Sequence, residues 1–85
     1  MHARFRIGLV NAPTPDLVHQ LRNYGEYVQG IVAGKALVDM HQVDSATEFF
    51  LVEVTDKRNL GDVMAALRKG TRPTVPDSHF TLERL

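Results

Sequence analysis

The sequence predicts an α+β domain in which one antiparallel sheet packs against two helices. Four stretches alternate apolar and polar residues with a period of two, and two others carry apolar residues at helical spacing. Their order along the chain is strand, helix, strand, strand, helix, strand. With 85 residues and 44% hydrophobic content, the chain suits a single domain over residues 1–85 with one core.

The first strand is expected over residues 4–10. Its alternate apolar residues are Phe5, Ile7 and Leu9. The helix that follows has a well-defined start, because Thr14 can cap it with its hydroxyl and Pro15 suits the first helical position. The end of this helix is left open, since Gly25 and Gly30 are both possible stops.

Two further strands are predicted to form a hairpin. Residues 35–43 alternate, and residues 48–54 form the most strand-like run of the chain, apolar on both faces. A strand that is apolar on both faces suits a central place in a sheet. Residues 44–47 supply turn chemistry between the two strands, in a turn long enough to carry a bulge.

The second helix is marked by one apolar stripe: Leu60, Val63, Met64 and Leu67. Asp56 or Asn59 is expected to cap its start, and Gly70 to follow its end. Residues 71–77, which include two prolines, predict an extended connector. Residues 78–85 alternate again and predict the last strand.

The element order βαββαβ is that of the ferredoxin-like fold, a four-stranded antiparallel sheet with both helices on one face. Short connections and right-handed crossovers leave few other arrangements for this order. The first and third strands are then central. The residues expected on the core face are Phe5, Ile7, Leu9, Val38, Met40, Phe50, Val52, Val54, Phe80 and Leu82.

The opposite face of the sheet, here called the open face, is predicted to mix apolar and ionisable side chains. The residues expected to form an interface or ligand surface there are Arg6, Leu37, Asp39, His41, Phe49, Leu51 and Glu53, with Arg4, His79 and Thr81 on the same face. Phe49 and Leu51 are too apolar to be left in water, so a partner, a ligand or the chain's own helix or tail should cover them. A second copy is preferred, since most small oligomers are symmetric homodimers.

The pattern of the central strand 49–54, the helix 60–67, the proline-containing connector and the short final strand resembles the small dimeric α+β barrels, of which muconolactone isomerase is one type. The resemblance spans most of the chain and includes no catalytic signature. It implies a homodimer whose facing sheets enclose a cavity, in which some members bind small organic ligands. It transfers no catalytic residue to this sequence.

His41 is the most interesting ionisable residue. It is expected beside Phe49 across the hairpin, with Asp39 on the same face, where it could act as acid or base in a lined pocket. A strand histidine is more often an ordinary surface or interface residue. Catalytic residues are therefore unknown, and whether the chain is an enzyme is left open.

Other charged residues carry simpler interpretations. Arg6 and Glu53 are expected to face the same way on neighbouring strands, which favours an ion pair over an anion site formed by Arg4 and Arg6. No close spacing of His, Asp and Glu predicts a metal site, and no cofactor is predicted.

Composition argues against several classes of protein. Ten basic residues balance ten acidic ones, which argues against a chain built mainly to bind nucleic acid. RNA-recognition domains share this element order, but here the first strand offers Arg6 and Gly8 where stacking aromatics are needed, and only Phe49 fits. The absence of cysteine excludes disulfides and thiolate metal sites.

No apolar run reaches the roughly 18 residues of a membrane helix, and the first residues lack the apolar segment of a signal peptide. The sequence therefore predicts a cytoplasmic protein with no membrane contact. Two functions follow. The first is a homodimer that binds a small organic ligand at the open face. The alternative is a protein-binding module, of inhibitor or immunity type, that uses the same face.

Overall fold

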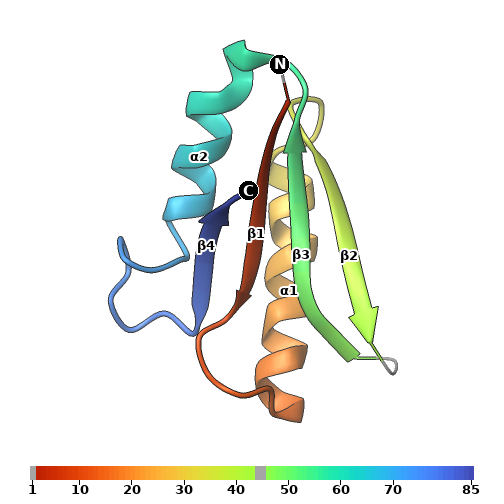
Figure 1. Cartoon of the computed structure of the whole chain (residues 1–85), viewed down its shortest axis with the longest axis vertical. Helices are drawn as coiled ribbons and strands as arrows, with labels where there is room; N and C mark the ends of the chain where they lie inside the picture. The colour runs from red at the N-terminus through yellow and green to blue at the C-terminus, as the bar shows by residue number, and fades with distance from the viewer. Residues whose placement is uncertain (1, 44–45) are drawn as a thin grey trace.

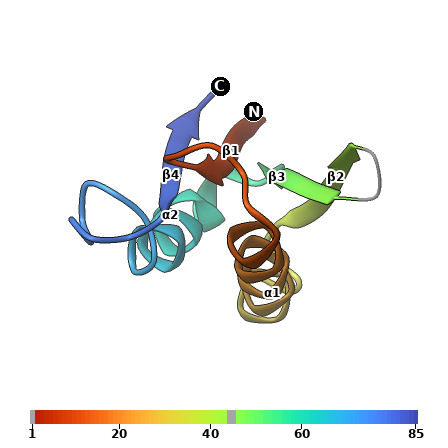
Figure 2. The same cartoon turned by 90° about the horizontal axis from the view of Figure 1, so that it is seen from below.

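The computed structural model of the chain describes residues 2–43 and 46–85. The elements are β1 (Ala3–Leu9), α1 (Pro15–Ile31), β2 (Leu37–Val43), β3 (Ala46–Val54), the 3-10 turn η1 (Lys57–Asn59), α2 (Leu60–Arg68) and β4 (Phe80–Arg84). The strands form one antiparallel sheet in the order β2-β3-β1-β4 (Figure 1). Figure 2 shows both helices on the same side of this sheet. The predicted α+β, ferredoxin-like arrangement, with β1 and β3 in the centre, is confirmed.

The core lies between the sheet and the two helices. Its fully buried strand residues are Ala3, Phe5, Ile7, Phe50, Val52 and Val54, and those of the helices and their ends are Leu21, Val28, Val32, Val63 and Leu67. The partly buried residues packed against them include Leu9, Val38, Met40, Phe80 and Leu82. All residues predicted for the core face are therefore in this cluster.

The predicted polar residues lie at or before both helix starts, but a side chain caps only α1 and the 3-10 turn η1, not α2 itself. The Thr14 hydroxyl accepts a hydrogen bond of 3.3 Å from the backbone N–H of Leu17, which caps α1. Asp56 caps η1, since its Oδ1 accepts a 3.0 Å hydrogen bond from the Arg58 N–H. Asn59 occupies the N-cap position of α2 but makes no side-chain cap bond.

Helix α1 passes through both of its glycines and ends at Ile31. Gly25 is buried where the helix meets the sheet, and a Cβ atom there would lie 2.6 Å from Met40 Sδ. Gly30 is exposed, with nothing within 4 Å of the same position. The left-handed glycine is Gly34, at φ +80°, in the turn that leads to β2. Gly25 is thus a close-packing residue rather than a helix stop.

Tyr24 joins α1 to the opposite edge of the core. Its ring stacks on Phe80, with centroids 4.9 Å apart and planes 9° apart. Its hydroxyl donates a 3.2 Å hydrogen bond to the carbonyl oxygen of Leu67 in α2. Burial, and secondarily the nearby Tyr27, raise the pKa of Tyr24. This side chain ties both helices to β4.

The connector between α2 and β4 is folded into turns, so the prediction of an extended connector is wrong. The Val75 N–H bonds to the Thr71 carbonyl, and the Arg72 N–H bonds to the carbonyl of Phe80. Arg72 Nε also donates to the Ser78 carbonyl at 2.6 Å. These side-chain and backbone bonds hold the loop against β4, at the side of the sheet in Figure 1. The last strand consequently begins at Phe80.

The hairpin differs from its prediction in extent. Asp44 and Ser45 of the predicted turn lie outside the described residues, whereas Ala46 already belongs to β3. The pairing of β2 with β3 shifts between His41 and Gln42, which is the irregularity expected of a bulge.

Candidate functional site

The strand register arranges the open face in three rows that cross the sheet. The first row holds Thr81, Gly8, Phe49 and His41, the second holds Glu83, Arg6, Leu51 and Asp39, and the third holds Arg4, Glu53 and Leu37. Each row runs from the β4 or β1 side to β2. The register therefore decides which of the predicted site residues are neighbours.

A shallow depression of about 440 Å³ lies on this face across β1, β3 and β2. Its lining residues are Arg4, Leu37, Asp39, His41, Leu51 and Glu53. The structure thus brings together five residues of the predicted interface or ligand surface and adds Arg4. The two leucines form its apolar part, and the charged residues surround them.

Phe49 lies outside this depression and is half-buried by its neighbours on the same face. The His41 ring stacks on it with centroids 4.6 Å apart and planes 13° apart. The Arg6 guanidinium carbon lies 4.6 Å from the Phe49 ring centroid, in a cation–π contact. Phe49 therefore has two partners in its own chain: His41 on β2, as the sequence predicted, and Arg6 on β1, which the sequence analysis did not predict.

The predicted ion pair between Arg6 and Glu53 is wrong. Glu53 Oε2 lies 3.6 Å from Arg4 Nε, and its other oxygen lies 3.1 Å from His2 Nδ1. Arg6 Nη1 lies 3.8 Å from Glu83 Oε2 on β4. The reason is the register, which places Arg4 opposite Glu53 and Arg6 opposite Glu83. Each arginine of β1 has its own carboxylate, which disfavours an anion site built from both.

His41 and Asp39 are close, as expected from their two-residue spacing. His41 Nε2 lies 3.2 Å from Asp39 Oδ2, but this buried nitrogen forms no hydrogen bond within the described part of the chain. Both side chains line the depression, and an imidazole and a carboxylate are groups that general acid–base catalysis uses. It defines no reaction by itself. His79 precedes β4, where its carbonyl accepts the Val10 N–H, and it lies outside the depression.

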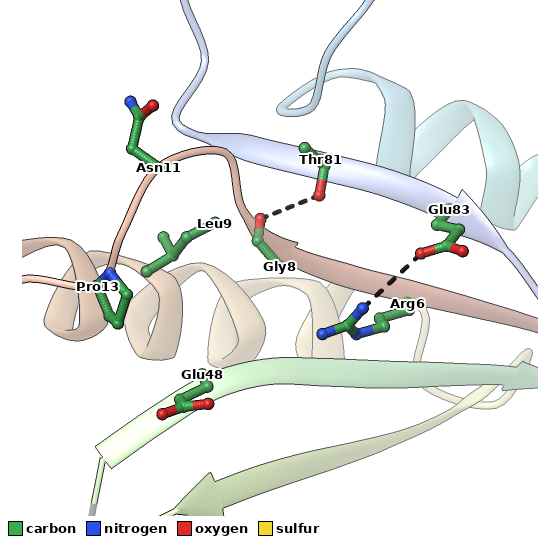
Figure 3. A pocket seen from close by; sticks show the side chains of 8 residues that line it. All are labelled: Arg6, Gly8, Leu9, Asn11, Pro13, Glu48, Thr81 and Glu83. Carbon is green, nitrogen blue, oxygen red and sulfur yellow. Dashed lines mark hydrogen bonds and ion pairs between the residues drawn. The ribbon is translucent and has the colours of Figure 1, made fainter.

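A second hollow, of about 150 Å³, was missed by the sequence analysis (Figure 3). It lies between β1, β4, the start of β3 and the loop after β1. Its lining residues are Arg6, Gly8, Leu9, Asn11, Pro13, Glu48, Thr81 and Glu83. The one signal in the sequence is Gly8, a glycine inside a central strand, which often marks a place where something approaches the backbone.

Comparisons with protein-family models, with curated proteins and with solved structures find no match for this chain. Within residues 2–43 and 46–85, no group of three or more His, Asp or Glu side chains is placed to hold a metal ion. Among the described helices, none combines the length and the apolar character needed to cross a membrane. The candidate site is thus interpreted from its own geometry.

Proposed function

We propose that the chain forms a homodimer in which the open faces of two copies pack together. The observation that supports it most is the pair of leucines in the depression. Leu37 is 68% exposed and Leu51 is half-buried beside it. In the part of the chain that the structure describes, both helices pack on the other face, so this apolar surface is free for a partner.

The charges of the open face favour a second copy over an oppositely charged partner. Arg4 and Arg6 lie on β1, whereas carboxylates lie on β2, β3 and β4. A two-fold axis parallel to the strands and over β3 would set β1 of one copy against β2 of the other. Arg6 would then face Asp39 of the second copy, and the Leu51 side chains of the two copies would cover one another.

The size of the face sets the expected affinity. Four strands at about 4.8 Å and some six residues at about 3.4 Å give roughly 400 Å² per copy. Two such faces are smaller than the roughly 1,600 Å² of a standard stable interface. We therefore expect a dissociation constant in the micromolar range rather than below it.

Closing two open faces would also enclose the depression of each copy. A cavity lined by leucines, with Asp39 and His41 at its edge, suits a small organic ligand with one polar group. The same arrangement is implied by the resemblance to the small dimeric α+β barrels. This ligand is the finer part of the proposal and depends on the dimer.

Sedimentation velocity over protein concentrations from about 1 µM to about 1 mM tests the dimer. Leu51→Asp should weaken self-association at least tenfold, because it places a charge in the apolar centre of the interface. Tyr27→Asp is the matched control, since Tyr27 is 63% exposed on the helical side. It should leave self-association unchanged.

A chain that stays monomeric over the whole range would overturn the proposal, as would equal losses in both variants. Binding of a different protein by the monomer, lost in Leu51→Asp, would instead favour an inhibitor or immunity-type module.

A further inference from the structure

The hollow beside Gly8 exists because this position of the central strand has no side chain. Gly8 lies between Thr81 on β4 and Phe49 on β3. A Cβ atom at Gly8 would lie 3.8 Å or more from its nearest neighbours, which is ordinary van der Waals contact. Packing therefore does not require glycine here, although glycine weakens a strand interior. What glycine provides is open space above the backbone.

The charges around the hollow leave a net negative charge. Arg6 is engaged by Glu83 at 3.8 Å and by the Phe49 ring. Glu48, on the other side of Gly8 in Figure 3, is exposed and has no ion pair within the described residues. An anion would have to displace Glu83 from Arg6 and would lie near an uncompensated carboxylate. A cation would neutralise Glu48 and leave the other pair intact.

The remaining lining adds a hydrogen-bonding group and an apolar wall. The Thr81 hydroxyl donates to the Gly8 carbonyl at 3.5 Å, so its oxygen is free to accept a hydrogen bond (Figure 3). Leu9 and Pro13 form the apolar side. A space of about 150 Å³ holds a molecule of roughly four to six non-hydrogen atoms.

We propose that this hollow binds a small organic ammonium compound, with Glu48 taking the ammonium group and Thr81 a second donor such as a hydroxyl. The hollow is formed within one chain. It shares Arg6 and Thr81 with the residues predicted from the sequence for the open face, and its lining requires no second copy. The proposal therefore goes beyond the homodimer and stands or falls separately from it.

Amide ¹H–¹⁵N NMR of the full chain, at constant ionic strength, tests this with three probes of nearly equal size. They are ethanolamine, which is a cation, ethylene glycol, which is neutral, and glycolate, which is an anion. Ethanolamine should cause saturable shifts of the amides of Gly8, Thr81 and Glu48. The other two should cause none that saturate.

Three variants locate the binding. Glu48→Gln should weaken ethanolamine binding at least fivefold, whereas Glu26→Gln, which removes an exposed carboxylate of α1, should not change it. Gly8→Ala should weaken binding by narrowing the hollow beside Thr81, with a melting temperature no lower than that of the wild type. Leu51→Asp keeps every lining residue of the hollow, so it should bind ethanolamine at least as tightly as the wild type does, because a second copy on the open face would cover part of the hollow.

Saturable shifts with glycolate would overturn the proposal, and so would equal losses in Glu48→Gln and Glu26→Gln, which indicate non-specific attraction to acidic groups. Full ethanolamine binding by Gly8→Ala would overturn it as well. If Leu51→Asp abolishes dimerisation while ethanolamine binds neither the wild type nor the monomeric Leu51→Asp variant, the hollow proposal alone fails.

Discussion

Replacing Gly70 by alanine should destabilise the fold, because this glycine lies against the ring of Tyr24. A Cβ atom at position 70 would lie 2.5 Å from Tyr24 Oη and 2.6 Å from its Cζ. The ring has little freedom to move, since it stacks on Phe80 and its hydroxyl is bonded to the carbonyl of Leu67. The clash must be relieved by breaking these contacts.

The expected cost follows from those two contacts. The aromatic stack contributes about 0.5–1.5 kcal/mol and the hydrogen bond of Tyr24 a similar amount. Gly70→Ala should therefore lower the free energy of unfolding by about 1–3 kcal/mol. For a domain of this size, about 1 kcal/mol shifts the melting temperature by roughly 4–8 °C.

Thermal and urea unfolding, followed by far-ultraviolet circular dichroism, measure this cost. Gly30→Ala is the matched control, because Gly30 is exposed inside α1 and has open space around it. Alanine there should raise the free energy of unfolding by about 0.5–1 kcal/mol through helix propensity. The same substitution is thus expected to have opposite signs at the two sites.

A double-mutant cycle with Tyr24→Ala separates the clash from other effects of the Gly70 substitution. If the contact with Tyr24 is the cause, Gly70→Ala should cost little in the Tyr24→Ala background. A Gly70→Ala protein as stable as the wild type would refute the reasoning. So would a penalty that is unchanged without the tyrosine ring.

Two further predictions concern α1. Burial and Tyr27 raise the pKa of Tyr24 above its ordinary value of 10.0, so the folded state holds this proton more tightly than the unfolded chain. The part of the free energy of unfolding that depends on this proton is fully present below about pH 10 and is lost as the pH rises through the folded-state pKa of Tyr24. Urea denaturation at a series of alkaline pH values should show that the free energy of unfolding falls with pH, and that it falls less steeply in Tyr24→Phe. An equally steep fall in both proteins would contradict this prediction. Thr14→Ala should cost about 1 kcal/mol in urea denaturation by removing the N-cap, whereas Thr14→Ser should retain most of the stability. Equal losses in both variants would show that the hydroxyl is not responsible.

Periodicity predicted the faces of the strands well, because burial on one face imposes the alternation directly. It could not predict the register, which fixes the partner of each side chain. Arg4 and Arg6 both face the same way as Glu53, and only the pairing of β1 with β3 places Arg4 opposite it. A shift of the strand register by two residues would leave each side chain on the same face of the sheet but would change the partner in every cross-strand ion pair.

The glycines of α1 could not predict where the helix ends, for a related reason. Gly25 and Gly30 look alike in the sequence as possible helix stops, yet α1 continues through both. The absence of a side chain at Gly25 is required by Met40 and Phe50, which come from strands distant in sequence. Such a contact cannot be predicted from the residues that neighbour Gly25 in the sequence. The same limit hid the hollow at Gly8, whose walls come from three strands and a loop.

The contacts of Phe49 decide which substitution is the proper test of the interface. Phe49→Asp would remove the stack with His41 and Arg6 inside one chain as well as any contact with a second copy. Weaker self-association in that variant could therefore reflect a changed face rather than a lost interface. Leu51 belongs to the apolar part of the depression, which leaves it available to a partner. Leu51→Asp consequently tests the interface with less disturbance of the chain that carries it.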